Sequence, residues 1–498
     1  MKIFKSRNRL LQEISRGSPI TAFGESSVAQ PTPITQISAQ YGLLDNVLTV
    51  TDNAASGTTS VVNEKFNCET GTAADGLASI TTRRQLAYKA GQGALARFTA
   101  IFSPGVLGSS QGAGLITAEN LFVFGYLNST EFGIVHARDG MDELQELTLT
   151  AAAGAETASV TIDGTVYSVP LTGVGTVQGD AYEIAQSLNA QVPNYQFTSN
   201  DNQVVAQAVI SDAQGAFAYS SAGTSTGSWN QLVAGAQPTL EFIPQSEWNV
   251  DTRISNDADV NLDPQLGNVY QIQFQYLGFG AINFFVEDKN TGALVLVHTI
   301  RFANSSTTTS INNPTFRVGW IARNIGNTTN VTVQGASAGA FVEGAIFRDN
   351  PPRSVSHEQL SIGSTLTNIL SFRNRINFFD KVNRAEVYPL LVSASTQATK
   401  FAFFKILLNP TFDSPVTFEY VDKSGSIVET TSDKVTVSNG LEIGTLTVVD
   451  GSSAIIEFNR TKDTVTSIYP GSTICIAAVI PSGSAADCQV SATWQEDL

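Results

Sequence analysis

The chain has 498 residues, a formal net charge of −16 and only 14% charged residues. This length exceeds one ordinary hydrophobic core, so we expect about three to four domains. Forty glycines beside so few charges favour short strands and turns over long solvated helices. The acidic excess argues against binding to nucleic acid, because phosphate contacts need clustered Lys and Arg.

Residues 1–24 differ from the rest because they are basic and carry apolar residues at helical spacing. They predict a short N-terminal helix that ends at Gly17-Ser18-Pro19. Two interpretations stay open: a frayed terminus, or a segment that anchors the chain to a larger acidic assembly. The candidate anchoring residues are Lys2, Phe4, Lys5, Arg7, Arg9, Leu10, Leu11 and Ile14. The segment lacks the apolar core of a signal peptide, and no run elsewhere is long enough for a membrane span.

Residues 25–143 alternate short apolar runs with Gly, Ser and Asn, which predicts the first part of a β-sandwich. Residues 144–236 differ and predict a small inserted α+β module. Within them, Asp163-Gly164 separates two strand-like runs, a strong signal for a two-residue hairpin. Asp180 and Glu183 fit a capping pattern at the start of a helix that continues through Leu188.

Residues 237–349 resume the strand pattern and predict the second part of the same sandwich. The stretch from Tyr270 to Tyr276 alternates apolar groups with glutamines, as a half-buried strand does. Pro351-Pro352 marks a boundary, because proline cannot donate to a sheet. Residues 350–498 then predict a C-terminal β-sandwich domain. The expected fold class is all-β, a multidomain β-sandwich or jelly-roll-like protein with the inserted module and the N-terminal helix.

The residues that usually carry catalysis or metal binding are sparse. Three histidines are widely separated, and none belongs to a metal-binding motif. Cys475 and Cys488 flank a loop and are neighbours on a predicted hairpin, but two reduced core thiols are favoured over a disulfide. No catalytic residue is assigned. Carboxylate pairs for glycoside hydrolysis stay open, because their separation is spatial.

Two further groups are candidate binding residues. Four oxygen-bearing side chains alternate in the sequence NDADVNLDP, a pattern that a loop can wrap around Ca²⁺, although a solvated acidic loop is favoured. These candidate ligands are Asp257, Asp259, Asn261 and Asp263. Three aromatic residues are candidate glycan contacts by stacking, with core packing as the favoured alternative. They are Tyr219, Trp229 and Trp248. No other cofactor is expected.

Several stretches together resemble a family of largely uncharacterised proteins of tailed bacteriophages and of large DNA viruses of algae and protists. They include GNVYQIQFQYLGFGAINFFVED, LVHTIRFANSSTTTSINNPTF, RNIGNTTNVTVQGASAGAFVEG, SRGSPITAFGE, YKAGQGALARFTAIF and EFGIVHARDG. The module sequence TLTAAAGAETASVTIDGTVYSV resembles an insertion that those proteins carry at this point. The resemblance extends to Gly344 and is weaker in the C-terminal region. It implies a virion structural protein, fibre-like and displayed on the tail or capsid, with no known catalytic residues.

The leading hypothesis is a fibre component of a virion that attaches by its N-terminus and displays its β domains to the host. Its expected partners are other capsid or tail proteins, two further copies in a homotrimer, and a host surface glycan or receptor. The trimer is expected by analogy with viral fibres. A capsid decoration or cement protein, a minor capsid protein, is the alternative. A polysaccharide depolymerase is the third hypothesis, although no enzyme activity is expected.

Overall fold

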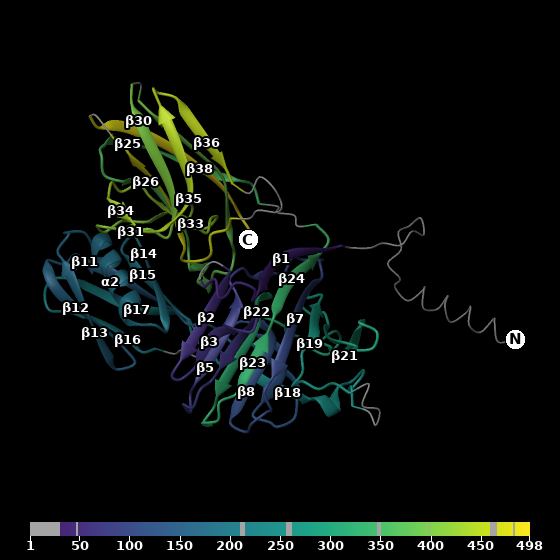
Figure 1. The fold of residues 1–498 in the computed structure, drawn as a ribbon. Coiled ribbons are helices and arrows are strands. Elements are labelled where there is room, and N and C mark those ends of the chain that lie inside the picture. The colour runs from purple at the N-terminus through teal and green to yellow at the C-terminus, as the bar shows by residue number, and fades with distance from the viewer. Residues whose placement is uncertain are drawn as a thin grey trace. The chain divides into compact units, whose positions relative to one another are not determined.

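The computed structural model describes residues 30–45, 48–209, 215–254, 261–345, 350–397, 399–458, 466–481 and 484–498. The fold is mostly β: 55% of residues lie in strands, and the described residues contain one α-helix. The sheets of Figure 1 are built on antiparallel pairings, such as β19 with β7, β22 with β8, β29 with β38 and β30 with β37. The predicted all-β multidomain fold class is confirmed. No helix among the described residues is long and apolar enough to cross a membrane.

The described residues form two compact units. The first unit takes residues up to 117, 121–136 and 241 onward to 345, and the second takes 118–120, 137–240 and 350–498. The chain thus leaves the first unit after residue 136 and returns to it at residue 241. Whether 144–236 and 350–498 behave as separate domains, with the boundaries expected from the sequence, stays a prediction.

The first unit consists of two large antiparallel sheets. One contains, in spatial order, β21 (Leu294–Ile300), β20 (Ile282–Glu287), β19 (Asn268–Phe274), β7 (Ala94–Phe102), β23 (Thr332–Gly335), β4 (Lys65–Glu69) and β3 (Thr58–Val62). In the same sheet, β24 (Ser337–Glu343) pairs with both β7 and β1 (Pro31–Ser38). The other contains β18 (Thr239–Pro244), β10 (Gly133–Arg138), β9 (Leu121–Leu127), β8 (Ser109–Ile116), β22 (Thr315–Asn324), β5 (Leu77–Thr82) and β2 (Thr49–Ala54). A short strand, β6 (Leu86–Ala87), pairs with β22, and a 3₁₀ turn, η1 (Gln245–Glu247), follows β18.

Aromatic side chains from both sheets fill the core of the first unit. The ring of Tyr270 on β19 lies 4.7 Å from that of Phe124 on β9, and Phe66 on β4 lies 5.3 Å from Trp320 on β22. These contacts cross from one sheet to the other, so the unit is a β-sandwich. The strand predicted around Tyr270 is confirmed as β19, because its alternating apolar residues face this core.

The first part of the second unit, residues 137–240, contains two small sheets and the helix. One sheet has the order β14 (Tyr195–Asn200), β15 (Gln203–Ala208), β11 (Leu144–Ala151) and β17 (Thr226–Val233). The other has the order β13 (Thr165–Thr172), β12 (Ala155–Ile162) and β16 (Phe217–Ser221). The predicted hairpin is confirmed: Asp163 and Gly164 join β12 to β13 with φ of 51° and 78°. Positive φ at both central residues defines the tight turn that suits hairpin twist.

The helix α2 (Val177–Gln191) starts earlier than the sequence predicts. Thr176 is its N-cap, and the hydroxyl of Thr176 accepts a hydrogen bond from the Gly179 N–H. The prediction of a cap at Asp180 is wrong. Its carboxylate instead accepts the Ala153 N–H at 2.6 Å, while Glu183 accepts the N–H and hydroxyl of Thr172. Both acids therefore bind neighbouring loop and strand backbone.

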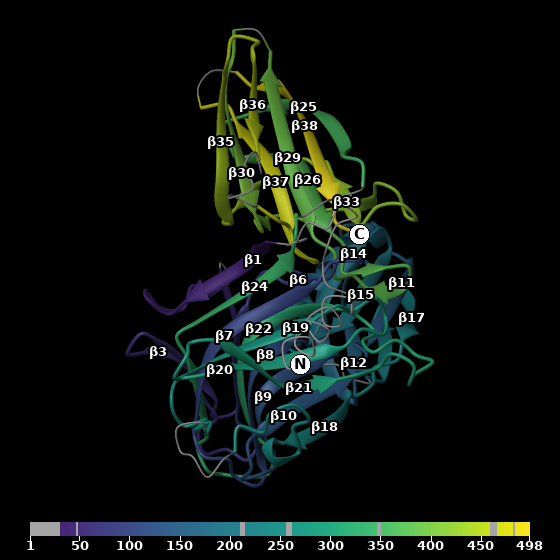
Figure 2. The same cartoon turned by 90° about the vertical axis from the view of Figure 1, so that its right-hand side faces the viewer.

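The second part, residues 350–498, is a sandwich of two sheets whose long strands run side by side in Figure 2. One sheet has the order β25 (Arg353–Ile362), β38 (Ala486–Glu496), β29 (Val387–Thr396) and β36 (Ser453–Glu457). The other has the order β32 (Glu419–Tyr420), β33 (Val428–Thr431), β26 (Thr367–Asn374), β37 (Thr473–Val479), β30 (Phe401–Leu408) and β35 (Leu441–Val449). Two short pairs complete it: β27 (Asn377–Phe378) with β28 (Lys381–Val382), and β31 (Thr411–Phe412) with β34 (Val437–Ser438).

Stacked rings of Phe372 on β26 and Trp494 on β38, 5.7 Å apart, join the two sheets of this sandwich. The alternative that makes the two C-terminal cysteines neighbours on one hairpin is wrong. Cys475 lies on β37 in one sheet and Cys488 on β38 in the other. Both thiols are free and buried, as the favoured interpretation of reduced core thiols predicts.

Candidate functional site

The residues proposed as an anchor, Lys2 to Ile14, lie outside the described residues. So do Asp257 and Asp259 of the calcium pattern. Asp263 is described, and it stabilises a turn: its carboxylate accepts the Gln265 N–H at 2.9 Å and its carbonyl accepts Asn268 Nδ2. Asn261 is described as well and lies outside any helix or strand. Within the described ranges, no cluster of three or more His, Cys, Asp or Glu side chains could hold a metal ion. A Ca²⁺ site at this loop stays a prediction.

The three candidate glycan-stacking rings do not come together in one site. Trp248 is 4% exposed and packs against Phe124 and Phe132 in the core of the first unit. Tyr219 and Trp229 belong to the second unit, where both rings pack partly buried against the core around α2. The hydroxyl of Tyr219 bonds to Ser225 at 2.6 Å. All three rings contribute to cores, which is the alternative that the sequence favours.

A pocket of about 320 Å³ lies in the second unit, where residues near α2 meet the C-terminal sandwich. Ligand pockets span about 300–1,000 Å³, so this one suits a single small molecule. Amides, hydroxyls and aromatic rings dominate its lining, and one residue is formally charged. The lining residues are Tyr182, Gln186, Asn189, Gln196, Phe197, Thr198, Arg373, Asn409, Pro410, Thr411, Phe412, Phe418, Gly471 and Thr473.

Regular secondary structure orients one wall of the pocket. Tyr182 and Gln186 are four residues apart on α2, so both side chains lie on the same face of the helix. Gln196 and Thr198 are two residues apart on β14, and alternation places them on one face of the strand. Gly471, with φ of 81°, makes room for this wall: a Cβ added there would meet the Gln196 amide nitrogen at 1.9 Å.

A second part of the lining comes from the loop between β30 and β31. Asn409 adopts φ of 51°, a left-handed conformation that asparagine tolerates better than most residues. Its side-chain amide oxygen, Oδ1, accepts the Thr473 N–H at 2.9 Å, which fixes the loop to β37. The half-buried ring of Phe412 follows and lies edge-on to Phe418, with ring centroids 6.3 Å apart.

Arg373, which lines the pocket, forms an ion pair that contacts both parts of the second unit. Arg373 on β26 contacts the Glu429 carboxylate at 2.5 Å, and these side chains are only 7% and 3% exposed. Arg373 also donates to the Ser199 carbonyl, and Asn200 donates to Glu429. The guanidinium lies over the Phe418 ring, 3.8 Å from its centroid. Each buried charge therefore has a partner.

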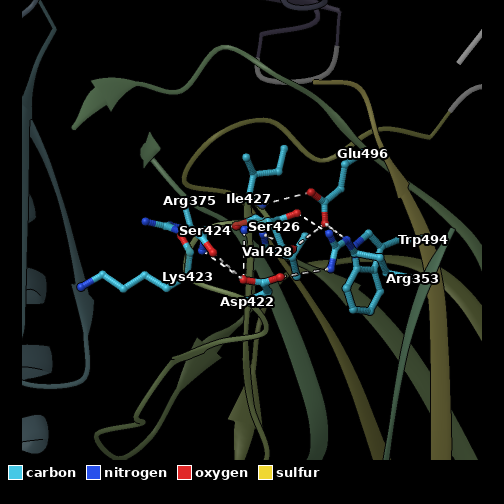
Figure 3. A network of polar contacts seen from close by, with 11 residues as sticks. Arg353, Arg375, Asp422, Lys423, Ser424, Ser426, Ile427, Val428, Trp494 and Glu496 are labelled. Atoms are coloured by element: carbon cyan, nitrogen blue, oxygen red, sulfur yellow. Dashed lines mark hydrogen bonds and ion pairs between the residues drawn. The ribbon is translucent and has the colours of Figure 1, made fainter. Parts of the chain in front are cut away.

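A neighbouring polar network fixes the strand that carries Glu429 (Figure 3). Glu496 accepts the Trp494 indole N–H at 3.0 Å, the Ser426 hydroxyl at 2.5 Å and the Ile427 N–H at 3.0 Å. Arg353 lies beside this carboxylate and donates to the Gly425 carbonyl. The network ties the start of β33 to the end of β38, and so it holds Glu429 beneath Arg373.

The electrostatic character of the pocket is polar but neutral. Glu429 compensates the only charged lining residue, Arg373. Burial raises the pKa of Tyr182 to about 12, and the positive charge of Arg373 opposes this shift. The phenol therefore stays protonated at neutral pH and can donate a hydrogen bond. The arrangement can bind a neutral polar ligand.

The buried groups that resemble catalytic residues have structural partners. His136 contacts Glu241 at 2.8 Å in the first unit. In the second unit, the guanidinium of Arg384 contacts both Glu119 and Asp142, so one positive charge lies beside two carboxylates. Both contacts are ion pairs within the second unit.

Sequence reasoning missed every residue of the pocket. One signal existed: Tyr182 and Gln186 lie at i and i+4 of the predicted helix, so they share one face of it. Their partners from β26 and the β30 to β31 loop carry no such pattern. Comparison with models of protein families and with curated proteins finds no match to the chain.

Proposed function

We propose that this chain is a structural protein of a virus particle, a fibre-like component of the tail or capsid that displays its β domains for host attachment. The observation that carries the proposal is the neutral pocket, built on two sheets and a helix and fixed by the buried ion pair of Arg373 and Glu429. Rigid elements that present unpaired polar groups are what a recognition site requires. The stretches that resemble virion proteins and the all-β architecture also support it.

In this proposal the N-terminal segment joins the chain to other virion proteins, and copies of the chain assemble as a homotrimer. Support for self-association comes from a groove of about 520 Å³ in the first unit, lined by residues of β1, β7 and β24. At this groove Tyr41 is 91% exposed, and Leu44 and Leu48 are each 46% exposed. Exposed apolar groups gathered at one groove are typical of protein interfaces. The occupant that we propose is a second copy of this chain.

Immunogold electron microscopy of purified source particles tests the location, with an antibody raised against residues 350–498. Label on a tail or on projecting fibres supports the proposal. Uniform label over the shell favours a capsid decoration protein, and no label on intact particles contradicts an exposed virion role. Deletion of residues 1–17 adds a second test: it should release a fibre from particles but only weaken a decoration protein. Release of sugar from host envelope material would instead indicate a depolymerase.

A further inference from the structure

We propose that the pocket between α2 and the β30 to β31 loop binds a neutral saccharide of one or two hexose rings. This inference rests on the proposed attachment function, because it names the ligand that the displayed second unit recognises. It concerns a site distinct from Tyr219, Trp229 and Trp248. Four features of the pocket lead to it: unpaired hydrogen-bonding groups, an aromatic ring, charge balance and size.

The pocket presents several polar groups that the fold leaves unpaired. The Tyr182 hydroxyl and the side-chain amides of Gln186 and Gln196 have no hydrogen-bond partner among the described residues. An amide offers both donors and an acceptor, and a hydroxyl offers one donor and two acceptors. Each sugar hydroxyl is likewise both donor and acceptor. A saccharide can therefore satisfy all of these groups at once, which a purely apolar ligand cannot.

An aromatic ring lies beside these polar groups. Phe412 is half-buried and lines the pocket, and its contact with Phe418 fixes the ring. Hexoses have a face of C–H groups that packs on aromatic rings while their hydroxyls project outward to polar partners. The combination of one ring with several amides thus matches the two chemistries of a sugar.

Charge selects a neutral sugar over an acidic one. Arg373 is the only charged residue in the lining, and Glu429 compensates it at 2.5 Å. One guanidinium nitrogen, Nη1, has no partner within the described part of the chain and can donate to a sugar oxygen without a net charge at the site. An anionic ligand would also meet the field of a chain that carries −16.

The size and rigidity of the pocket limit the ligand further. A volume of about 320 Å³ is at the small end of the range for ligand sites, so it holds one or two rings and not a polymer. Tyr182 is held on a helix and Gln196 on a strand, and Gly471 leaves space for the Gln196 amide. Preorganised groups lose little entropy on binding, which favours a polar ligand that makes few apolar contacts.

Saturation-transfer NMR with the full chain tests the inference. The probes are lactose, cellobiose, maltose and N-acetylglucosamine at millimolar concentration, with N-acetylneuraminic acid as an acidic comparison. We expect transfer to at least one neutral probe, and three- to tenfold weaker binding, roughly, in Tyr182→Phe and in Gln196→Met, since each loses one neutral hydrogen bond. Tyr167→Phe and Gln203→Met are matched controls, because they change the same groups in the same part of the chain outside the pocket.

Three results would overturn the inference: no transfer to any neutral probe, stronger transfer to the acidic sugar, or equal binding in the pocket variants and their controls. Circular dichroism of each variant separates a lost contact from a lost fold. The location experiment is independent of this one. Label on fibres without sugar binding would contradict the saccharide ligand and leave the proposed virion role standing. Sugar binding without label on particles would contradict the virion role and leave the saccharide ligand standing.

Discussion

Substitution of Arg373 by methionine should destabilise the second unit by about 3–5 kcal/mol, the usual cost of removing one partner from a buried ion pair. The guanidinium makes two contacts of 2.5 Å to Glu429 and one to the Ser199 carbonyl. After the change, Glu429 stays buried with Asn200 as its only remaining side-chain donor in the described structure. Hydrogen exchange measured on peptides from β14, β26 and β33 gives the local free energy of opening.

Local exchange is the right measurement because a chain with two units has no single unfolding transition. Combining Arg373→Met with Glu429→Gln removes the stranded charge and keeps an acceptor for Asn200, so it should recover at least about 2 kcal/mol. Lys405→Met is the control, since its ion pair with Glu442 is 40% and 43% exposed and is therefore screened by solvent. A loss in Arg373→Met no larger than that in Lys405→Met, or no recovery in the double variant, would refute this account of the buried ion pair.

Three further changes test other parts of the molecule. Burial lowers the pKa of His298 to about 4, so protonation of the unfolded chain should cost the first unit about 1 kcal/mol between pH 6.5 and pH 5, after allowance for solvent screening. Thermal unfolding of His298→Asn should lack most of this dependence. Burial raises the pKa of Cys68 and of Cys475 to about 12, so a thiol reagent at pH 7 should react with none of the three cysteines until urea is added. Replacing Tyr41 and Leu48 by serine should reduce the oligomer mass measured by light scattering; a wild-type monomer would contradict the proposed self-association.

The elements that the sequence predicts well are those with local causes. Asp163-Gly164 defines its hairpin because both residues adopt positive φ without help from distant residues. The alternation around Tyr270 identifies β19 because one face of that strand meets the core. Predicting where α2 starts requires deciding whether Thr176 or Asp180 is the N-cap. That decision depends on the bond between Asp180 and Ala153 in a neighbouring loop, which the sequence does not show.

The pocket could not be predicted, because its walls are distant in sequence and none of its residues belongs to a motif. Tyr182 and Gln196 lie nearly two hundred residues before Arg373, and Asn409 and Gly471 follow later. In the sequence alone, amides and hydroxyls at these positions cannot be distinguished from ordinary solvent-exposed residues. Only the packing of α2 and β14 against the C-terminal sandwich makes them converge.

The same packing gives the segment at 144–236 a specific role. Helix α2 and strand β14 supply part of the pocket lining, while β26 and the loop after β30 supply other parts of it. The bond from Arg373 to Ser199 joins β26 to β14, and the bond from Asn200 to Glu429 joins β14 to β33. A change that loosens this ion pair should therefore weaken ligand binding even where every group that contacts the ligand is intact. Glu429→Gln makes such a change, because Glu429 does not line the pocket. Reduced sugar binding in this variant, with Tyr182, Gln186 and Gln196 unchanged, would show that the pocket depends on the contacts between the two parts of the second unit.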